Sequence, residues 1–343
     1  MTSKTGFAVM AVSAVSALAL AGCQQTPPEE EADEGAAVGN ATPADSPAAT
    51  DPDGEVLELP REVAQVTDMA ATSVTIAVRS ADHLAVGDAA AFQDGSAAVV
   101  EIPTDCGQLT AADNEFLLGC GTEVLSFDSA RPEQPEKIAV DEEFSVTAAA
   151  RTSSGELFVA SDQVTDVAIY KDGERSDSFA VEDATDQLLA VPNQDGTDNV
   201  VRTLRADSTI QSLDWERSRA GGRLRVGVGL GQASVGDNGT IVVSDTLGER
   251  VAIYNAEDVI RLHQYGNTDG VPWATAWDDS RQLAWVTTTD NNQAQTFEIS
   301  HGVPEERAKV STVANAQNMV ALSDGTIAIA SATGDGLQII KDI

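Results

Sequence analysis

Aspartates at a recurring position are the side chains of this 343-residue sequence best suited to chemistry. Five of them follow short apolar runs along the chain: Asp82, Asp162, Asp207, Asp245 and Asp290. Carboxylate oxygens are the ligands that Ca²⁺ prefers, so a ring of these residues could hold calcium on one face of the fold. A chain this acidic must also place carboxylates in many exposed loops, so a merely solvated surface is the alternative. No other cofactor is predicted.

Two polar stretches, residues 266–273 and 287–293, predict the longest loops near these aspartates. Loops on a rigid scaffold are where binding residues concentrate. We therefore expect the five aspartates and Trp273 to form a binding face. Packing of Trp273 between neighbouring elements is the alternative.

Residues for nucleophilic or metal-dependent catalysis do not converge in the sequence. The histidines His83, His263 and His301 fall in different units of the repeat described below, so we expect no shared metal or proton relay. The run Gly227–Gly231 precedes a strand-like segment and not a helix, so it predicts a turn and not a dinucleotide-binding loop. We predict no catalytic residue.

Cys106 and Cys120 lie symmetrically about the turn-like residues 112–114. A hairpin around that turn would bring the two thiols together on adjacent strands, and an exported protein folds where thiols oxidise. We predict a disulfide between them, with two free buried thiols as the alternative.

The third cysteine, Cys23, ends the apolar run 7–21 in the sequence Leu-Ala-Gly-Cys. The run is shorter than the ~20 residues that span a bilayer, and it has the layout of a secretory signal. The tetrapeptide is similar to the bacterial lipobox, which implies cleavage before Cys23 and lipid on its thiol. We therefore expect residues 1–22 to be a signal peptide and the protein to be exported and anchored to the outer face of the cytoplasmic membrane. Simple secretion is the alternative.

Residues 24–54 combine Pro, Ala, Thr and Gly with acidic residues and contain no Lys or Arg. Such a composition cannot bury a core, so we expect 23–54 to be the lipidated cysteine with a disordered tether, and 55–343 to be the folded domain. Without the signal peptide the chain has 19 basic and 55 acidic residues, a formal charge of −36. This charge excludes nucleic acid and anionic lipid as partners and favours a cationic one. Solubility in a saline or alkaline habitat is the alternative.

A repeat of about 42 residues organises the folded domain. Units begin at residues 73, 114, 155, 198, 239, 281 and 325, and the best-matched pair reads Gly-Glu-Leu-Phe-Val-Ala-Ser-Asp from Gly155 and Gly-Thr-Ile-Val-Val-Ser-Asp from Gly239. Each unit contains strand-like runs separated by turn residues, and in the fifth unit the second run, residues 240–244, is continuously apolar instead of alternating. Four short strands every ~42 residues is the pattern of a propeller blade, so the sequence predicts an all-β, seven-bladed β-propeller.

The seventh unit stops one strand short, and a spare strand, residues 55–60, precedes the first unit. We therefore expect the N-terminal strand to complete the last blade, which leaves no sheet edge unpaired at the junction. A six-bladed ring would have to discard one unit.

The Gly-x-Leu/Ile-x-Val-x-Ser-Asp units, each followed by Val-Ala-Ile-Tyr (residues 167–170 and 251–254), resemble the blades of YncE-like and NHL-type bacterial propellers. With the lipobox and acidic tether, the chain resembles the actinobacterial prolipoproteins called LppL. The resemblance implies a surface-exposed propeller lipoprotein of unsettled function.

Two functions follow. The preferred one is a monomeric, non-enzymatic binding or scaffolding propeller that recognises an envelope protein or a cationic surface component. The alternative is a Ca²⁺-dependent, lactonase-like hydrolase or lyase; a quinone-dependent dehydrogenase is less favoured because its repeated tryptophan motif is absent.

Overall fold

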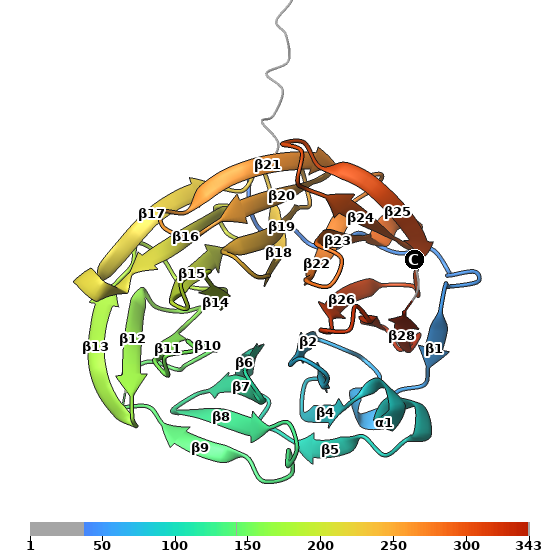
Figure 1. Cartoon of the computed structure of the whole chain (residues 1–343). Coiled ribbons are helices and arrows are strands. Elements are labelled where there is room, and N and C mark those ends of the chain that lie inside the picture. Colours follow the sequence, from blue (N-terminus) through green and yellow to red (C-terminus); the bar gives the residue numbers. More distant parts are fainter. Residues whose placement is uncertain (1–37, 142, 342–343) are drawn as a thin grey trace, which may run out of the picture. The chain divides into compact units, whose positions relative to one another are not determined.

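The computed structural model describes residues 38–141 and 143–341, which form seven antiparallel sheets of four strands around a central axis (Figure 1). In blades 1–6 the strands run from the axis outward in chain order. Blade 1 comprises β2 to β5 (Asp68–Ala71, Ile76–Arg79, His83–Gly87, Ala98–Glu101), blade 2 β6 to β9 (Cys106–Ala112, Glu115–Cys120, Glu123–Asp128, Glu136–Ala139), blade 3 β10 to β13 (Ala148–Arg151, Leu157–Ala160, Asp166–Lys171, Glu174–Ala180), blade 4 β14 to β17 (Gln187–Pro192, Asp198–Leu204, Thr209–Asp214, Arg219–Arg225), blade 5 β18 to β21 (Leu230–Val235, Thr240–Asp245, Arg250–Asn255, Arg261–Asn267), blade 6 β22 to β25 (Pro272–Asp278, Leu283–Thr288, Gln293–Glu298, Glu305–Ser311), and blade 7 β26 to β28 with β1 (Ala316–Ala321, Ile327–Ser331, Leu337–Ile340, Glu55–Leu57).

Short helices occupy a few of the connections in the described chain. The α-helix α1 (Ala89–Asp94) lies between β4 and β5; the Asp88 side chain caps its first turn, and Gly95 ends it with φ +76°. Three 3-10 turns are present: η1 (Arg61–Val63), η2 (Trp215–Arg217) and η3 (Thr289–Asn291). None of the helices in the described chain is long and apolar enough to cross a membrane.

Every interface between neighbouring blades has its own apolar cluster. Successive side chains of a strand point to opposite faces, so a strand covered on both faces favours consecutive apolar residues. In β19, Ile241 and Val243 pack toward blade 4, whereas Val242 packs toward blade 6. The continuous apolar runs of the repeat are therefore explained by burial between two neighbours.

The predicted ring closure is confirmed. The strand β1 pairs antiparallel with β28, with Glu55 opposite Ile339 and Leu57 opposite Leu337. Leu57 is also buried in the cluster between blades 7 and 1. Seven complete blades result, as the repeat predicts.

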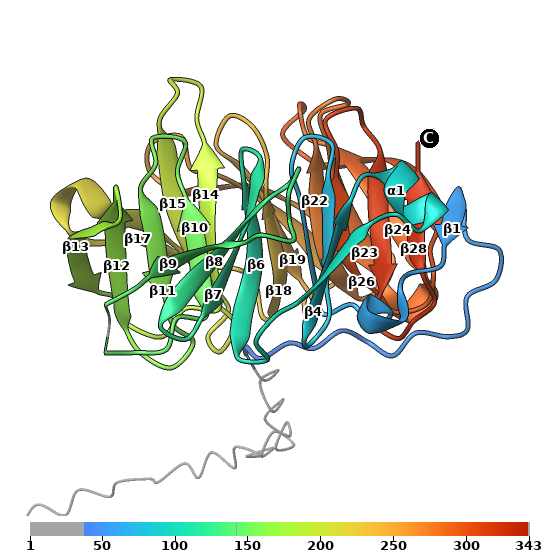
Figure 2. The ribbon, with the colours of Figure 1, turned by 90° about the horizontal axis from the view of Figure 1, so that it is seen from below.

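The boundary of the expected tether was wrong. Residues 38–53, here called the strap, lie along one face of the propeller, where they are seen in blue in Figure 2. We call this the strap face; it also carries the loops that join the second and third strands of each blade. The Gly39 amide donates to the Val228 carbonyl, and the Asn40 amide to the Arg205 carbonyl. Ala41 is buried in the cluster between blades 6 and 7.

Further along, the strap is tied to blades 6 and 7 by short polar residues. The Ser46 hydroxyl donates to the Thr289 carbonyl and accepts from the Asn315 amide. The Asp53 and Ser311 backbones are joined by a hydrogen bond, and the Asp53 carboxylate also accepts from the Ser311 amide at 2.6 Å. A polar, proline-containing segment is thus ordered by hydrogen bonds of its backbone and of short side chains to the loops beneath it. Composition alone does not reveal such partners.

Graded N-terminal truncation of the exported protein tests this assignment. A chain starting at Val38 should melt at the same temperature as the mature chain. One starting at Gly54 loses the strap and its hydrogen bonds, and should be less stable by roughly 2–5 kcal/mol. One starting at Arg61 also loses β1 and its apolar cover, and should be the least stable. Equal unfolding midpoints for the Val38 and Gly54 chains would show that the strap contributes nothing.

Candidate functional site

The five predicted aspartates lie around the strap face, but their side chains do not come together in one cluster. Asp82 and Asp162 are exposed, and Asp82 lies 2.9 Å from the His83 ring nitrogen Nδ1. Asp207 is ion-paired with Arg223, and Asp290 accepts a hydrogen bond from the Val271 amide. Across residues 38–141 and 143–341, no group of three or more His, Cys, Asp or Glu side chains is arranged to hold a metal ion. The calcium ring is therefore not formed by these residues.

The prediction that Asp245 contacts a partner was wrong, because its side chain is fully buried. Its Oδ1 accepts from the amides of Val228 (2.9 Å) and Gly229 (3.0 Å), and its Oδ2 pairs with Arg250 at 2.6 Å. A Cβ atom on Gly227 would lie 1.7 Å from Asp245 Oδ2, so glycine is required there. The glycine run is the predicted turn between two blades, shaped around this carboxylate.

Trp273 is also unavailable to a partner, being only 5% exposed. The Arg205 guanidinium lies 4.9 Å from the centre of its ring, a cation–π contact. Arg205 also donates to the carbonyl of Ala41 in the strap at 2.6 Å. The alternative expected from the sequence, that Trp273 packs between elements, is the correct one.

The remaining sequence predictions concern cysteines and histidines. The disulfide Cys106–Cys120 is confirmed and joins the first two strands of blade 2. The histidines lie in blades 1, 5 and 6, each beside a polar neighbour of its own, as for His263 with Gln264 and His301 with Ser300. Cys23 lies outside the described residues.

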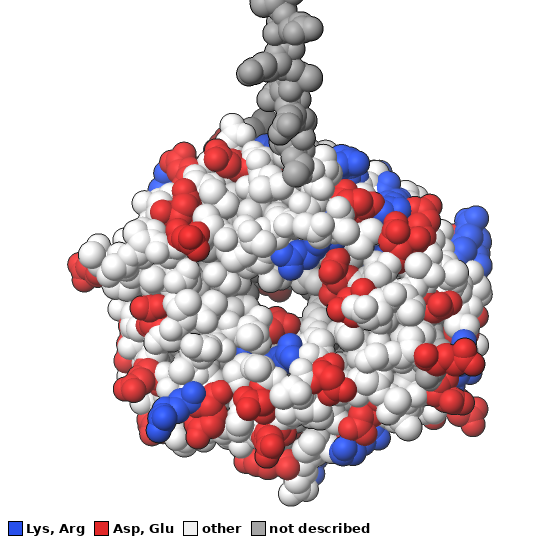
Figure 3. Space-filling model, turned by 180° about the vertical axis from the view of Figure 1, so that it is seen from behind, with Lys and Arg blue, Asp and Glu red and all other residues white. Residues whose placement is uncertain are grey.

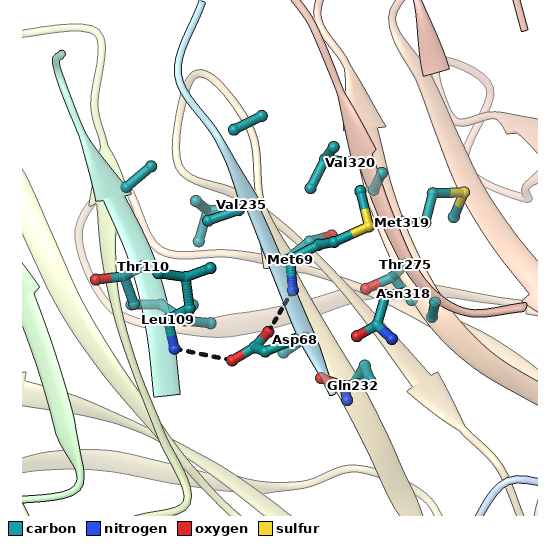
Figure 4. A pocket seen from close by; sticks show the side chains of 18 of the residues that line it. Asp68, Met69, Leu109, Thr110, Gln232, Val235, Thr275, Asn318, Met319 and Val320 are labelled. Atoms are coloured by element: carbon teal, nitrogen blue, oxygen red, sulfur yellow. Dashed lines mark hydrogen bonds between the residues drawn. The ribbon is translucent and has the colours of Figure 1, made fainter. Parts of the chain in front are cut away.

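The central channel is the concave site that the structure offers, and its opening is seen at the centre of the strap face in Figure 3. Its cavity of about 220 Å³ is lined by first strands of six blades. Each first strand begins at the strap face, because the second strand ends there. Asp68, Gln232 and Asn318 lie toward this end of the channel, and Met69, Met319 and Val320 toward the other (Figure 4). The channel thus has a polar mouth and an apolar interior.

Polar side chains of the first and second strands also join blade to blade, an arrangement we call the girdle. Gln108 reaches past the alanine-rich β10 of blade 3 and bonds both the amide (2.8 Å) and the carbonyl of Leu188 in blade 4. The other links run from Asp68 to Leu109, Gln187 to Ala233, Ser244 to Trp273, Thr287 to Ala316, and Asn318 to Val66. Together they connect blade 1 to 2, 2 to 4, 4 to 5, 5 to 6, 6 to 7 and 7 back to 1.

Asp68 is the one charged residue among those that line the channel. Burial raises the pKa of its carboxyl to about 6, although the Leu109 amide, the Arg79 guanidinium and the Met69 amide all act to lower that pKa. The two amides donate to its two oxygens, each at 2.8 Å (Figure 4). Asp68 therefore changes charge near pH 6, whereas an ordinary aspartate does so near pH 4.

Sequence reasoning missed these channel residues. A polar side chain lies within the first three residues of the first strand in several units, as at Asp68, Gln108, Gln187 and Gln232. This recurrence could have indicated a polar channel mouth. The sequences of the first strands, however, resemble one another less than those of the second strands that defined the repeat.

Comparison with known proteins supports the fold and no family. No protein-family model matches the chain, and no curated protein sequence does. Solved structures do: a streptogramin B lyase (TM-score 0.64, 10% identity, 83% of this chain and 96% of that one) and virginiamycin B lyase from Staphylococcus aureus (0.63, 10%, 84% and 99%). Hydrazine synthase of Kuenenia stuttgartiensis also matches (0.64, 12%, 83% and 97%). At these identities the likeness shows the β-propeller fold alone.

The aspartates of the strap face can be separated by mutation into structural and solvated ones. Asp245→Ala removes the buried carboxylate that Arg250 and the amides of Val228 and Gly229 share, and should destabilise the fold by about 3–5 kcal/mol. Asp162→Ala, at an exposed site, should change stability by less than about 0.5 kcal/mol. Urea unfolding of both variants gives the comparison; an Asp245→Ala protein as stable as Asp162→Ala would contradict the structural role.

Proposed function

We propose that this protein is a non-enzymatic binding propeller, held at the cell envelope by lipid on Cys23, which takes up a small ligand through the mouth of its central channel. The observation that carries the proposal is the channel itself, which has a polar mouth, an apolar interior and a wall fixed by the girdle. Ligand sites are characteristically concave and largely apolar, with a few polar groups held in place. The walls here are already ordered, so binding costs little rearrangement.

The lipid anchor and the LppL-like identity belong to the same proposal. They are supported by the Leu-Ala-Gly-Cys sequence and the preceding apolar run. The charge of −36 on the mature chain supports a cationic ligand or a cationic envelope partner. The hydrolase or lyase alternative depended on a carboxylate ring around calcium, and the burial of Asp245 removes a member of that ring. We therefore do not propose it.

Blocking the channel tests the binding role. Ala190 lines the channel and is partly exposed to it, so Ala190→Phe should fill much of the cavity while keeping an apolar residue on β14. The mature protein, incubated with small molecules extracted from the cell envelope and then washed, should retain a solute detectable by mass spectrometry, and Ala190→Phe should not. Ala130→Phe, at an exposed turn, is the matched control. Equal retention by both variants at equal melting temperature would exclude the channel as the site.

The anchor is tested separately in living cells. Cys23→Ala removes the thiol that lipid would modify, so the protein should be released into the medium or remain as an uncleaved precursor. Fractionation with labelling by a fatty-acid analogue measures both outcomes. Unchanged membrane association of Cys23→Ala would overturn the anchor.

A further inference from the structure

The lining of the channel restricts the chemistry of a ligand. Beyond the polar mouth, Met69, Val235, Met319 and Val320 form an apolar belt (Figure 4). Methionine side chains are flexible and polarisable, and they adapt to ligands of irregular shape. The cavity of about 220 Å³ is smaller than the roughly 300–1,000 Å³ of pockets that bury drug-sized ligands. The channel therefore suits a small molecule with one polar end and a short apolar end.

The mouth offers acceptors from three different blades. Asp68 accepts two amide hydrogen bonds, which leaves part of the acceptor capacity of its carboxylate unused. The side-chain N–H group of Asn318 donates a hydrogen bond to the Val66 carbonyl, so the side-chain oxygen of Asn318 is left as an acceptor. Gln232 contributes a third side-chain oxygen, which receives only a long hydrogen bond of 3.3 Å from Gln187. Three acceptors match the three N–H groups of a primary ammonium ion.

The charge that lines the mouth is the carboxylate of Asp68, which has the sign that an ammonium ion requires. Arg79 on β3, directly beside Asp68 in the sheet, is the charged group that faces it. Arg79 does not line the channel, and its guanidinium donates to the carbonyls of Cys106 and Gly107 on β6. From the other inner strands Asp68 shares the mouth with carboxamides, which carry no charge. The net charge of the whole protein adds to the attraction of a cation.

Resting on the proposed channel function, we propose that the ligand is a small organic ammonium ion whose charged end binds Asp68, Gln232 and Asn318 and whose short apolar tail lies against Met69 and Met319. An ammonium ion pairs with the ionised carboxylate, so its binding weakens as acid protonates Asp68. With a pKa of about 6 for that carboxyl, about one tenth is ionised at pH 5, and the affinity there should be roughly tenfold lower than at pH 7.5. An aliphatic ammonium ion keeps its own charge throughout, since such groups titrate near pH 10.

The sequence provides a direct probe of the channel. Of its four methionines, Met1 and Met10 belong to the predicted signal peptide, so the mature chain keeps Met69 and Met319, and both line the channel. In mature protein labelled with ¹³C-methyl methionine, both signals should shift on titration with n-butylammonium at pH 7.5, with roughly tenfold weaker binding at pH 5. 1-Butanol, which has the same tail without the charge, should bind at least about tenfold more weakly at pH 7.5.

Matched variants decide the role of the carboxylate. Asp68→Asn should abolish the pH dependence and most of the n-butylammonium affinity, while Asp82→Asn, which removes the same charge from an exposed site, should keep both. If Asp68→Asn does not fold, Gln232→Leu at the same mouth should weaken binding roughly fivefold. Equal titrations for the wild type and both mouth variants would overturn the proposal.

The two proposals fail in different ways. Shifts caused equally by 1-butanol and n-butylammonium would refute the ammonium ligand but leave the channel as a binding site. No shift with either probe, together with unchanged solute retention by Ala190→Phe, would refute the channel function as well.

Discussion

Closure of the ring is the constraint on which the rest of this structure depends. Each blade is a small sheet with two apolar faces, and each face is covered only by a neighbouring blade. An open ring would leave one face of the first and last blades in water, together with a sheet edge, and both are costly. The three residue pairs between β1 and β28 prevent this, and the girdle repeats the same closure at the axis with hydrogen bonds.

The girdle also links stability to the character of the channel. Some of the side chains that bind one blade to the next also make the mouth polar, as Asp68 and Gln108 show. The partners of these two side chains are backbone groups of first strands, at Leu109 and Leu188, and first strands have no further strand on the channel side. A side chain that satisfies such an edge has its orientation fixed by it. The mouth is therefore rigid because the ring is held together there.

Much of the fold was predictable from the sequence because burial between blades produces a regular signal. The second strands share a run of consecutive apolar residues, as Ile241–Val243 in β19 shows, so the repeat, the number of blades and the closing strand could be derived from spacing alone. The disulfide followed from symmetry about a turn. The site was less predictable, because the sequence pattern does not distinguish a solvated aspartate from a buried one. Asp162 is exposed, whereas Asp245, at the same position of its repeat, is buried against Arg250. The strap was not predicted for a related reason: its order comes from hydrogen bonds to the carbonyls of Arg205 and Thr289, which its own composition does not encode.

The strap has a mechanical consequence. If Cys23 carries the anchor, only residues 24–37 separate the membrane from the first strap contacts, a reach of at most about 50 Å even when fully extended. A pull on the anchored end then meets the hydrogen bonds of Gly39 and Asn40 before it reaches β1. The strap would therefore carry this tension first and transmit it to the loops of blades 4 to 6 that it contacts. The three-residue seam that closes the ring is thereby shielded from forces that act on the cell surface.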